Sequence, residues 1–269
     1  VAQPRVRWHE SAEAGAGTGM EQLTPLWLLK YLPNMLACHV TIIHGCEGPS
    51  NTITCAEASG VLCVGESTRV IQRGAADLCF SGGVEAKVNP MGILRLDLAG
   101  WSAPTGEETD GARLAKPYDD SAEGGLVAEG GGVLVLESLA TAQARGAKPY
   151  AEVVGVGGGT SDPFYSAGAE DEGFRYAILN ALDDAEIAPD RIDAIVPMAS
   201  GVECLDRAEL GALRAVFGDR LAQIPLVSTM PNVGMCMAGS GALQVAVAAG
   251  CLKNQKLPAR VHAGTPKSG

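Results

Sequence analysis

Apolar residues along this chain occur in two patterns, short unbroken runs and longer segments with helical spacing. The unbroken runs predict buried strands at 51–56, 76–81, 133–136, 151–156, 192–196 and 225–228. Apolar positions three and four residues apart predict helices at 59–73, 172–185, 207–217 and 238–252. Strands without polar alternation, separated by helices, are typical of sheets covered on both faces. The pattern therefore predicts an α/β fold with mixed, mostly buried sheets.

The best-defined local unit is a strand, a helix and a second strand. It consists of residues 51–56, 59–73 and 76–81, and Gly74 stands where a helix C-cap belongs. Such a unit implies parallel pairing of its two strands with a right-handed crossover. Residues 100–125 are the longest irregular stretch, which we expect to be a functional loop.

Composition narrows the class of protein and of partner. Of the 269 residues 46% are apolar, only 4% are aromatic and 35 are glycine, which suits a core of small aliphatic side chains. The net charge of −11 argues against nucleic acid, because phosphate contacts need clustered Lys and Arg, and against an anionic membrane surface. The longest apolar run is too short to span a bilayer. We therefore expect neither nucleic acid nor a membrane as a partner.

Eight cysteines are scattered at residues 38, 46, 55, 63, 79, 204, 236 and 251. No CxxC pair occurs and several of the cysteines lie inside apolar runs, which indicates reduced thiols and a cytoplasmic protein. The sequence shows no metal-ligand spacing. Its glycine runs at 130–132 and 157–159 do not precede a helix in the spacing of a nucleotide-binding loop. We expect neither a metal nor a cofactor.

Four strings of residues resemble the β-ketoacyl synthase branch of the thiolase superfamily. They lie at 48–92 (GPSNTITCAEASG to NPMG), 113–155, 206–218 and 237–252. The resemblance covers nearly everything from Leu23 to Leu257, and it implies the thiolase-like layered α-β-α-β-α fold, truncated at both ends relative to the family.

The resemblance also implies a domain organisation. We expect an irregular N-terminal segment at 1–22 and a thiolase-like core at 23–257, followed by a C-terminal tail at 258–269. The core would consist of a nucleophile-region half, about 23–150, and a second half, about 151–257.

Ketosynthases condense acyl and malonyl thioesters with a Cys at a helix start, two His and a Lys. The family's Ala-Cys-x-Ser-Gly elbow falls on residues 56–60 without a gap, so Glu57 stands at the nucleophile position. Met198 and Met235 stand at the two His positions and Met230 at the Lys position. A thioether neither titrates near neutral pH nor donates a hydrogen bond. The resemblance therefore predicts a family member in which none of the catalytic residues is intact.

Several roles remain open for Glu57 and its neighbour Cys55. Glu57 could be a helix-capping acid in an inactive pocket, since a carboxylate is favourable at a helix N-terminus. It could stand for the Gln that chain-length-factor subunits often carry there, or act as a general base whose pKa is raised by burial. Cys55 is a possible alternative nucleophile, but using it requires a two-residue register slip. No His is left to activate it, because His39 and His44 lie in a strand-like segment outside the catalytic set.

Two functions follow from the resemblance. The first is a catalytically inactive, chain-length-factor-like partner of an active ketosynthase, paired with a paralogue or with a second copy and served by acyl carrier protein. The apolar segment 23–40 would line its interface or acyl tunnel. The alternative is an acyltransferase or decarboxylase with altered chemistry that uses Glu57 or Cys55.

Two pairs of charged residues also need an interpretation. Arg69 and Arg73 form either a small carrier-protein patch or a solvated helix face. Asp206 and Glu209 match acidic positions that orient the family's catalytic loop, which indicates a structural role.

Overall fold

The computed structural model of this protein describes residues 24–161, 172–259, 261 and 265. The chain divides into two compact units between Thr52 and Ile53, and each is described by itself. The segment predicted to be irregular at 1–22 and most of the predicted tail lie outside the described residues. The division of the core near residue 150 stays a prediction.

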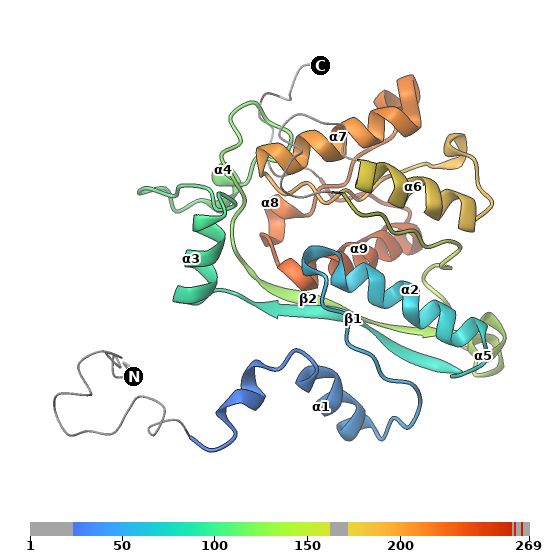
Figure 1. The fold of residues 1–269 in the computed structure, drawn as a ribbon. Coiled ribbons are helices and arrows are strands. Elements are labelled where there is room, and N and C mark those ends of the chain that lie inside the picture. The colour runs from blue at the N-terminus through green and yellow to red at the C-terminus, as the bar shows by residue number, and fades with distance from the viewer. Residues whose placement is uncertain (1–23, 162–171, 260, 262–264, 266–269) are drawn as a thin grey trace, which may run out of the picture. The chain divides into compact units, whose positions relative to one another are not determined.

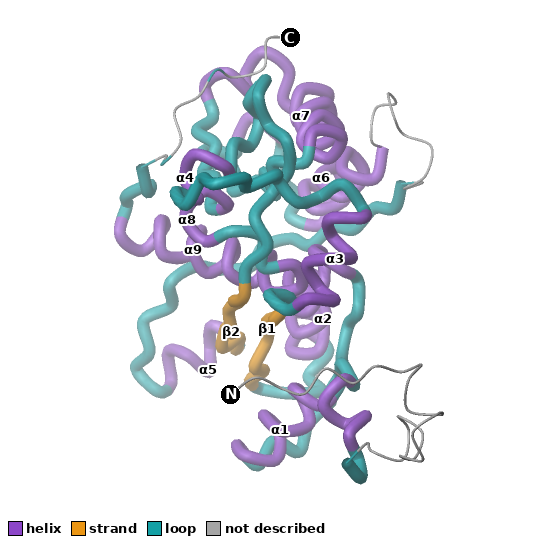
Figure 2. The backbone as a smooth tube through the Cα atoms, turned by 90° about the vertical axis from the view of Figure 1, so that its left-hand side faces the viewer, coloured by secondary structure: helices purple, strands orange, loops and turns teal. Residues whose placement is uncertain are grey.

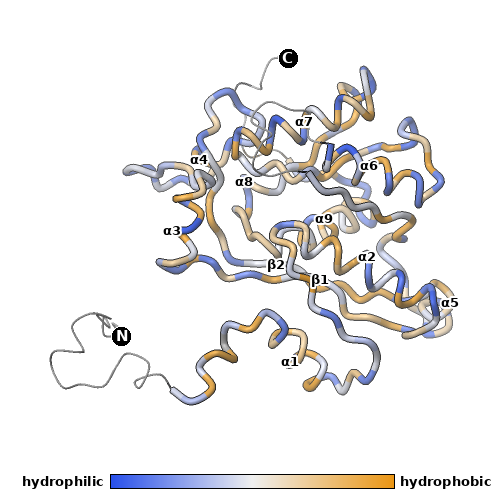
Figure 3. Tube along the Cα trace, viewed as in Figure 1, coloured by the Kyte–Doolittle hydropathy of each residue, from blue (hydrophilic) through white to orange (hydrophobic). Residues whose placement is uncertain are grey.

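The first unit holds two helical elements, η1 (Trp27–Tyr31) and α1 (Met35–His44). α1 ends at Gly45, whose φ of 59° lies in the left-handed region that favours glycine. The strand-like conformation expected for His39 and His44 is wrong, because both lie in α1. Apolar residues are frequent along this short segment (Figure 3). Their spacing therefore could not distinguish a helix from a strand.

The second unit is built on two antiparallel strands, β1 (Leu78–Ala86) and β2 (Glu129–Glu137). The register places Leu78 opposite Glu137 and Ala86 opposite Glu129. Helices α2 (Ser59–Gln72) and α9 (Ser240–Asn254) lie side by side over one face of the two strands (Figure 1).

The parallel strand–helix–strand unit predicted around α2 is wrong. Within the described chain β1 pairs only with β2, in antiparallel fashion. Residues 51–55 have no regular structure and lead into η2 (Ala56–Ala58). Four of those five residues are exposed, so the run buries too little apolar surface to hold a strand.

Three other predicted strands are segments that do not pair into a regular β-ladder. Residues 151–161 form no strand, and the runs at 192–196 and 225–228 meet in one parallel bridge, between Ile195 and Leu226. Within the described residues, regular strand is confined to β1 and β2 (Figure 2). These runs mix exposed with half-buried or buried residues, and apolar composition could not show whether another strand lies beside them.

All four predicted helices are confirmed, with ends shifted by at most about one turn. They are α2, α6 (Glu172–Asp184), α7 (Glu203–Phe217) and α9. The sequence did not indicate the shorter elements, which are α3 (Pro90–Leu98), α4 (Gly111–Leu114), α5 (Leu139–Ala144), η3 (Pro189–Arg191), η4 (Gly218–Gln223), α8 (Met230–Val233) and η5 (Met237–Gly239). Among the described residues there is no helix with the length and apolar character that crossing a membrane requires.

Glycines let backbone meet backbone where α2, β1 and the start of α9 cross. A Cβ on Gly60 would lie 2.6 Å from the Ala242 nitrogen, and one on Gly83 would lie 2.3 Å from the Ala238 oxygen. Real Cβ atoms do not approach this closely, so any side chain at Gly60 or Gly83 would push these elements apart. This crossing positions the helix starts that surround the candidate site.

Candidate functional site

The candidate site begins at the sharp turn that leads into α2. Ala56 has a φ of 45°, a left-handed conformation that costs a non-glycine residue about 1–2 kcal/mol. The Ser59 hydroxyl holds the turn, because it donates to the Ala56 carbonyl oxygen over 2.7 Å and accepts from the Cys55 N–H over 2.9 Å. A strained turn fixed in this way presents the next residue, Glu57, at the start of the helix.

Glu57 is half-buried and incompletely bonded. Its Oε1 atom is buried and has no hydrogen-bond partner within the described residues. Burial raises the pKa of the Glu57 carboxyl, and only the hydrogen bond from its own backbone N–H opposes the rise. The carboxyl therefore holds a proton more readily than an exposed glutamate does.

Met230 and Met235 lie together in one apolar cluster. Both are buried and pack with Met237, Leu96 and Ala115, which surround them with apolar atoms. The Met235 backbone is held by the segment that precedes β2, since the Met235 N–H donates to the Leu126 oxygen over 2.6 Å. Thioether side chains in such a setting fill space and supply no acid or base.

Met198 stands at the start of a loop that two carboxylates of α7 support. Glu209 accepts the N–H of Met198 over 2.6 Å and that of Ala199 over 2.9 Å. Asp206 accepts the Ser200 hydroxyl over 2.9 Å and the Gly201 N–H over 3.1 Å. Asp206 and Glu209 are three residues apart and so lie on one face of the helix. Burial raises the pKa of both carboxyls.

The structure brings these parts together around Gly125. A Cβ on Gly125 would lie 2.6 Å from the Ser200 oxygen and 3.5 Å from the Met235 sulfur. The loop that carries Met198 and the side chain of Met235 therefore border the same glycine. The fourth position, Glu57, lies on η2, which packs against η5 immediately after Met235.

The alternative nucleophile is poorly placed for chemistry. The Cys55 side chain is exposed, as are those of Cys46 and Cys204, whereas Cys236 is buried. The described part of the second unit contains no histidine that could take a proton from a thiol. The described residues also contain no cluster of His, Cys, Asp or Glu that could hold a metal ion.

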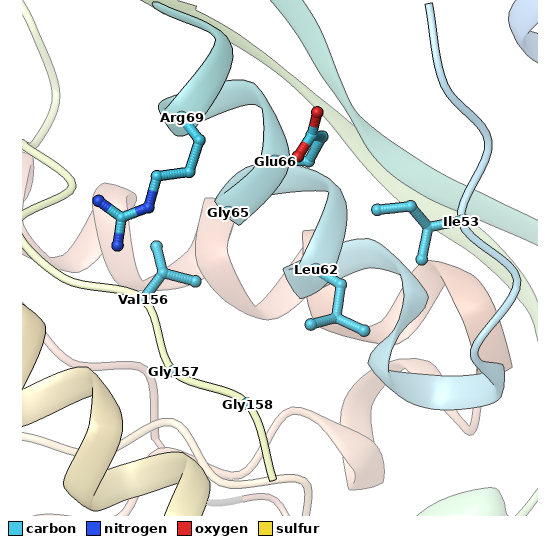
Figure 4. A pocket seen from close by; sticks show the side chains of 8 residues that line it. All are labelled: Ile53, Leu62, Gly65, Glu66, Arg69, Val156, Gly157 and Gly158. Atoms are coloured by element: carbon cyan, nitrogen blue, oxygen red, sulfur yellow. The ribbon is translucent and has the colours of Figure 1, made fainter. Parts of the chain in front are cut away.

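Two hollows lie on the second unit, and neither is lined by Glu57, Met198, Met230 or Met235. One, of about 330 Å³, lies between α2 and the extended segment that includes Val156, and Arg69 borders it (Figure 4). Arg69 forms an ion pair with Asp184 of α6, and Arg73 forms one of 3.4 Å with Glu66. Both members of the predicted basic patch therefore have carboxylate partners on this chain. The other hollow, of about 280 Å³, lies at the start of α7.

Sequence reasoning missed Tyr118 as a part of this site. Its hydroxyl donates to Glu209 over 2.6 Å and its backbone N–H donates to Asp206 over 2.9 Å. Tyr118 lies in the stretch predicted to be a functional loop, and that was the only available signal. Its contacts join positions about 90 residues apart, which no local pattern reveals.

Two buried serines, Ser59 at the turn and Ser81 in β1, have opposite expected effects when replaced by Ala. The Ser81 hydroxyl of β1 is buried and has no hydrogen-bond partner in the described part of the chain, so Ser81→Ala should raise the free energy of unfolding by about 1 kcal/mol. Ser59→Ala removes two hydrogen bonds at the turn and should lower it by about 1–2 kcal/mol. Urea unfolding of the two variants measures both changes. A loss of stability in Ser81→Ala would show that this hydroxyl is bonded in solution.

Comparison with known proteins adds an independent line of evidence. Residues 8–142 match the N-terminal domain of β-ketoacyl synthases, and residues 150–264 match the C-terminal domain. A 3-oxoacyl-[acyl-carrier-protein] synthase 2 from Staphylococcus aureus is 32% identical over 252 residues, covering 92% of this chain and 61% of the relative. The chain thus spans less than two thirds of the length of this relative.

Solved structures give a consistent result. The ishigamide ketosynthase/chain length factor superimposes with a TM-score of 0.80 at 26% identity, covering 95% of this chain and 60% of that one. A type II polyketide synthase ketosynthase, bound to the hexaketide and in complex with its acyl-carrier protein, gives a TM-score of 0.86. Its identity is 24% and the match covers 93% of this chain and 62% of that one, so this likeness concerns the fold alone.

Proposed function

Because this chain belongs to the β-ketoacyl synthase family, we propose that it serves fatty acid or polyketide biosynthesis as a non-catalytic partner of an active ketosynthase, in the manner of a chain length factor. Its fold is the thiolase-like layered α/β fold of the ketosynthases, as the sequence predicted. Two points are proposed: that the chain does not catalyse condensation, and that it pairs with another ketosynthase.

One observation carries the proposal. The four positions that match the family's Cys, two His and Lys hold Glu57, Met198, Met235 and Met230. Met230 and Met235 are buried in an apolar cluster, where thioethers neither move protons nor stabilise an enolate. The backbone N–H groups of Met235 and Met198 are nevertheless hydrogen-bonded, so the proposed loss concerns side chains and not the backbone.

The proposed partners are an active ketosynthase or a second copy of this chain, together with acyl carrier protein. The similarity to a ketosynthase/chain length factor structure supports pairing with a ketosynthase. The similarity to a 3-oxoacyl-[acyl-carrier-protein] synthase supports acyl carrier protein as a partner. Free thiols suit the reducing cytoplasm as the place of action. Arg69 and Arg73 are weaker candidates for carrier-protein contacts, since both already pair with carboxylates of this chain.

Glu57 has a defined role in this proposal. Burial raises the pKa of Glu57, so it takes up a proton more readily than an exposed glutamate. When protonated it presents a donor group beside an acceptor oxygen, as an amide does, at the position of the family's nucleophile. Glu57→Gln should therefore preserve pairing and product length, whereas Glu57→Ala would open the site beside η5.

Intact-protein mass spectrometry with hexanoyl- and malonyl-carrier protein tests the proposal. The chain is incubated alone and with an active ketosynthase from the same source, and light scattering records pairing. We expect no acyl adduct on this chain, acylation of the partner ketosynthase, and a stable complex of the two. A hexanoyl adduct on this chain that disappears in Cys55→Ala would contradict the proposal.

A second candidate function is acyl transfer or decarboxylation by altered chemistry. The unpartnered, buried Oε1 of Glu57 and the raised pKa of its carboxyl favour it over a purely structural role for this residue. It requires turnover of malonyl-carrier protein by the chain alone, lost in Glu57→Gln and retained in Cys55→Ala. Turnover that persists in both variants would exclude both residues.

A further inference from the structure

Carboxylates of α7 accept the backbone N–H groups of the loop that borders the candidate site. Every side-chain acceptor for the N–H groups of Met198, Ala199 and Gly201 is a carboxylate of α7. The loop needs such support, because Ala199 has a φ of 47° and is fully buried. Its conformation therefore depends on the position of the Glu209 and Asp206 carboxylates.

Tyr118 is what fixes those two carboxylates from outside the helix. Within the described chain, it is the one residue beyond α7 and the 198–201 loop that bonds to both. Tyr118 itself has a φ of 60°, so the long loop turns sharply to bring its hydroxyl and its N–H to α7. Pro117 and Asp119 on either side are almost fully buried, which anchors this turn.

We propose that Tyr118 is a positioning residue of the family site, whose hydroxyl holds the Glu209 carboxylate where it receives the Met198 and Ala199 amides. The inference deepens the proposed function, because the loop it fixes forms the border of the non-catalytic site. The inference concerns the backbone of the 198–201 loop, so it does not require the Met198 side chain to take part in chemistry.

The charge state of Glu209 gives the proposal a distinctive signature. An ionised carboxylate can accept all three bonds that Glu209 receives, whereas a protonated one loses acceptor capacity. Burial is the main cause of the raised pKa of Glu209, and the Asp206 carboxyl adds to the rise while the Tyr118 hydroxyl opposes it. Tyr118 remains a donor, because burial and then Glu209 hold its pKa well above the ordinary value. Among the described residues of α6, η3 and η4, which pack against α7, no charged group adds to these causes.

The direction of the pH dependence follows from these causes. The Met198 and Ala199 amides lower the pKa of Glu209, so a local opening that breaks these two bonds and leaves the carboxyl buried raises that pKa. By linkage, the loop is held while Glu209 is ionised and loosens as the pH falls through the pKa of the held form. Tyr118→Phe removes a donor that favours the ionised form, so the pKa of Glu209 rises further. Loosening should then begin at a higher pH in the variant than in the wild type.

Hydrogen exchange at a series of pH values tests this on the chain itself. Protection of the amides at 198–201, corrected for intrinsic exchange, should fall on acidification at a pH above the ordinary glutamate range, while α2 keeps its protection. In Tyr118→Phe the loss of protection should occur at higher pH. At a pH where the wild-type loop is still protected, protection of the 198–201 amides in the variant should be about tenfold or more lower. Tyr150→Phe, which changes an exposed tyrosine beside Lys253, should leave these amides unchanged.

The outcomes separate this inference from the proposed function. Equal loss of protection at every pH would mean that Tyr118 only packs, and it would overturn the inference, as would no change at all. Should the Phe variant not fold, the wild-type pH series still decides, because a loop held without regard to pH contradicts the role given to Glu209. No ketosynthase partner enters the measurement, so a failure to pair would count against the proposed function alone.

Discussion

Replacement of Asp206 by Ala is expected to lower the free energy of unfolding by about 3–5 kcal/mol. The side chain is only 1% exposed and accepts hydrogen bonds from the Tyr118 N–H, the Ser200 hydroxyl and the Gly201 N–H. Removing the carboxylate leaves these donors buried without an acceptor, and water has little access to replace it. Urea unfolding followed by circular dichroism measures the loss.

Asp190→Ala is the matched control for that experiment. Asp190 is an exposed aspartate of η3, and its removal should change stability by about 0.5 kcal/mol or less. If Asp206→Ala were as mild as the control, the network around the 198–201 loop would contribute nothing to stability in solution.

The second large effect is expected at the crossing of α2 and α9. Gly60→Ala places a methyl group 2.6 Å from the Ala242 nitrogen and 3.0 Å from the Ala238 oxygen. Neither atom can move alone, because the Ala238 oxygen belongs to the backbone of η5 and the Ala242 nitrogen to the first turn of α9. We expect a loss of about 3 kcal/mol, at the upper end of overpacking effects.

Gly211→Ala makes the same chemical change in the opposite environment. Gly211 lies inside α7 with nothing within 4 Å of the added methyl group. Alanine in a helix interior is favoured over glycine by about 1 kcal/mol, so this variant should be more stable than the wild type. Thermal unfolding of the two variants should therefore show shifts of opposite sign, and shifts of the same sign would refute the packing argument.

Helices were predictable from this sequence because their signal is local. The apolar spacing of α2, α6, α7 and α9 repeats over three turns or more, and tertiary structure did not override it. Strands were less predictable, because a ladder needs a neighbour from elsewhere in the chain. The runs at 151–156 and 51–56 have strand-like composition, yet the first lies extended without a ladder and the second is largely exposed.

The candidate site divides in the same way. The sequence points to Glu57, Met198, Met230 and Met235 because the family motif around each is continuous in sequence, and their roles stay a prediction. Tyr118 could not be predicted, since its bonds to α7 depend on how a long irregular loop folds back. The unpartnered Oε1 of Glu57 was equally hidden, because burial of a single atom follows from packing and not from residue type.

The exposed thiols of Cys46, Cys55 and Cys204 have a practical consequence for work with this protein. In air, exposed cysteines oxidise, and two copies joined through Cys46 or Cys204 would elute as a dimer that owes nothing to a ketosynthase partner. Adventitious alkylation of Cys55 would likewise add mass two residues before Glu57, close to the position where an acyl group is sought. Pairing and acylation should therefore be measured in fresh reductant, with the sulfhydryl count checked before each experiment.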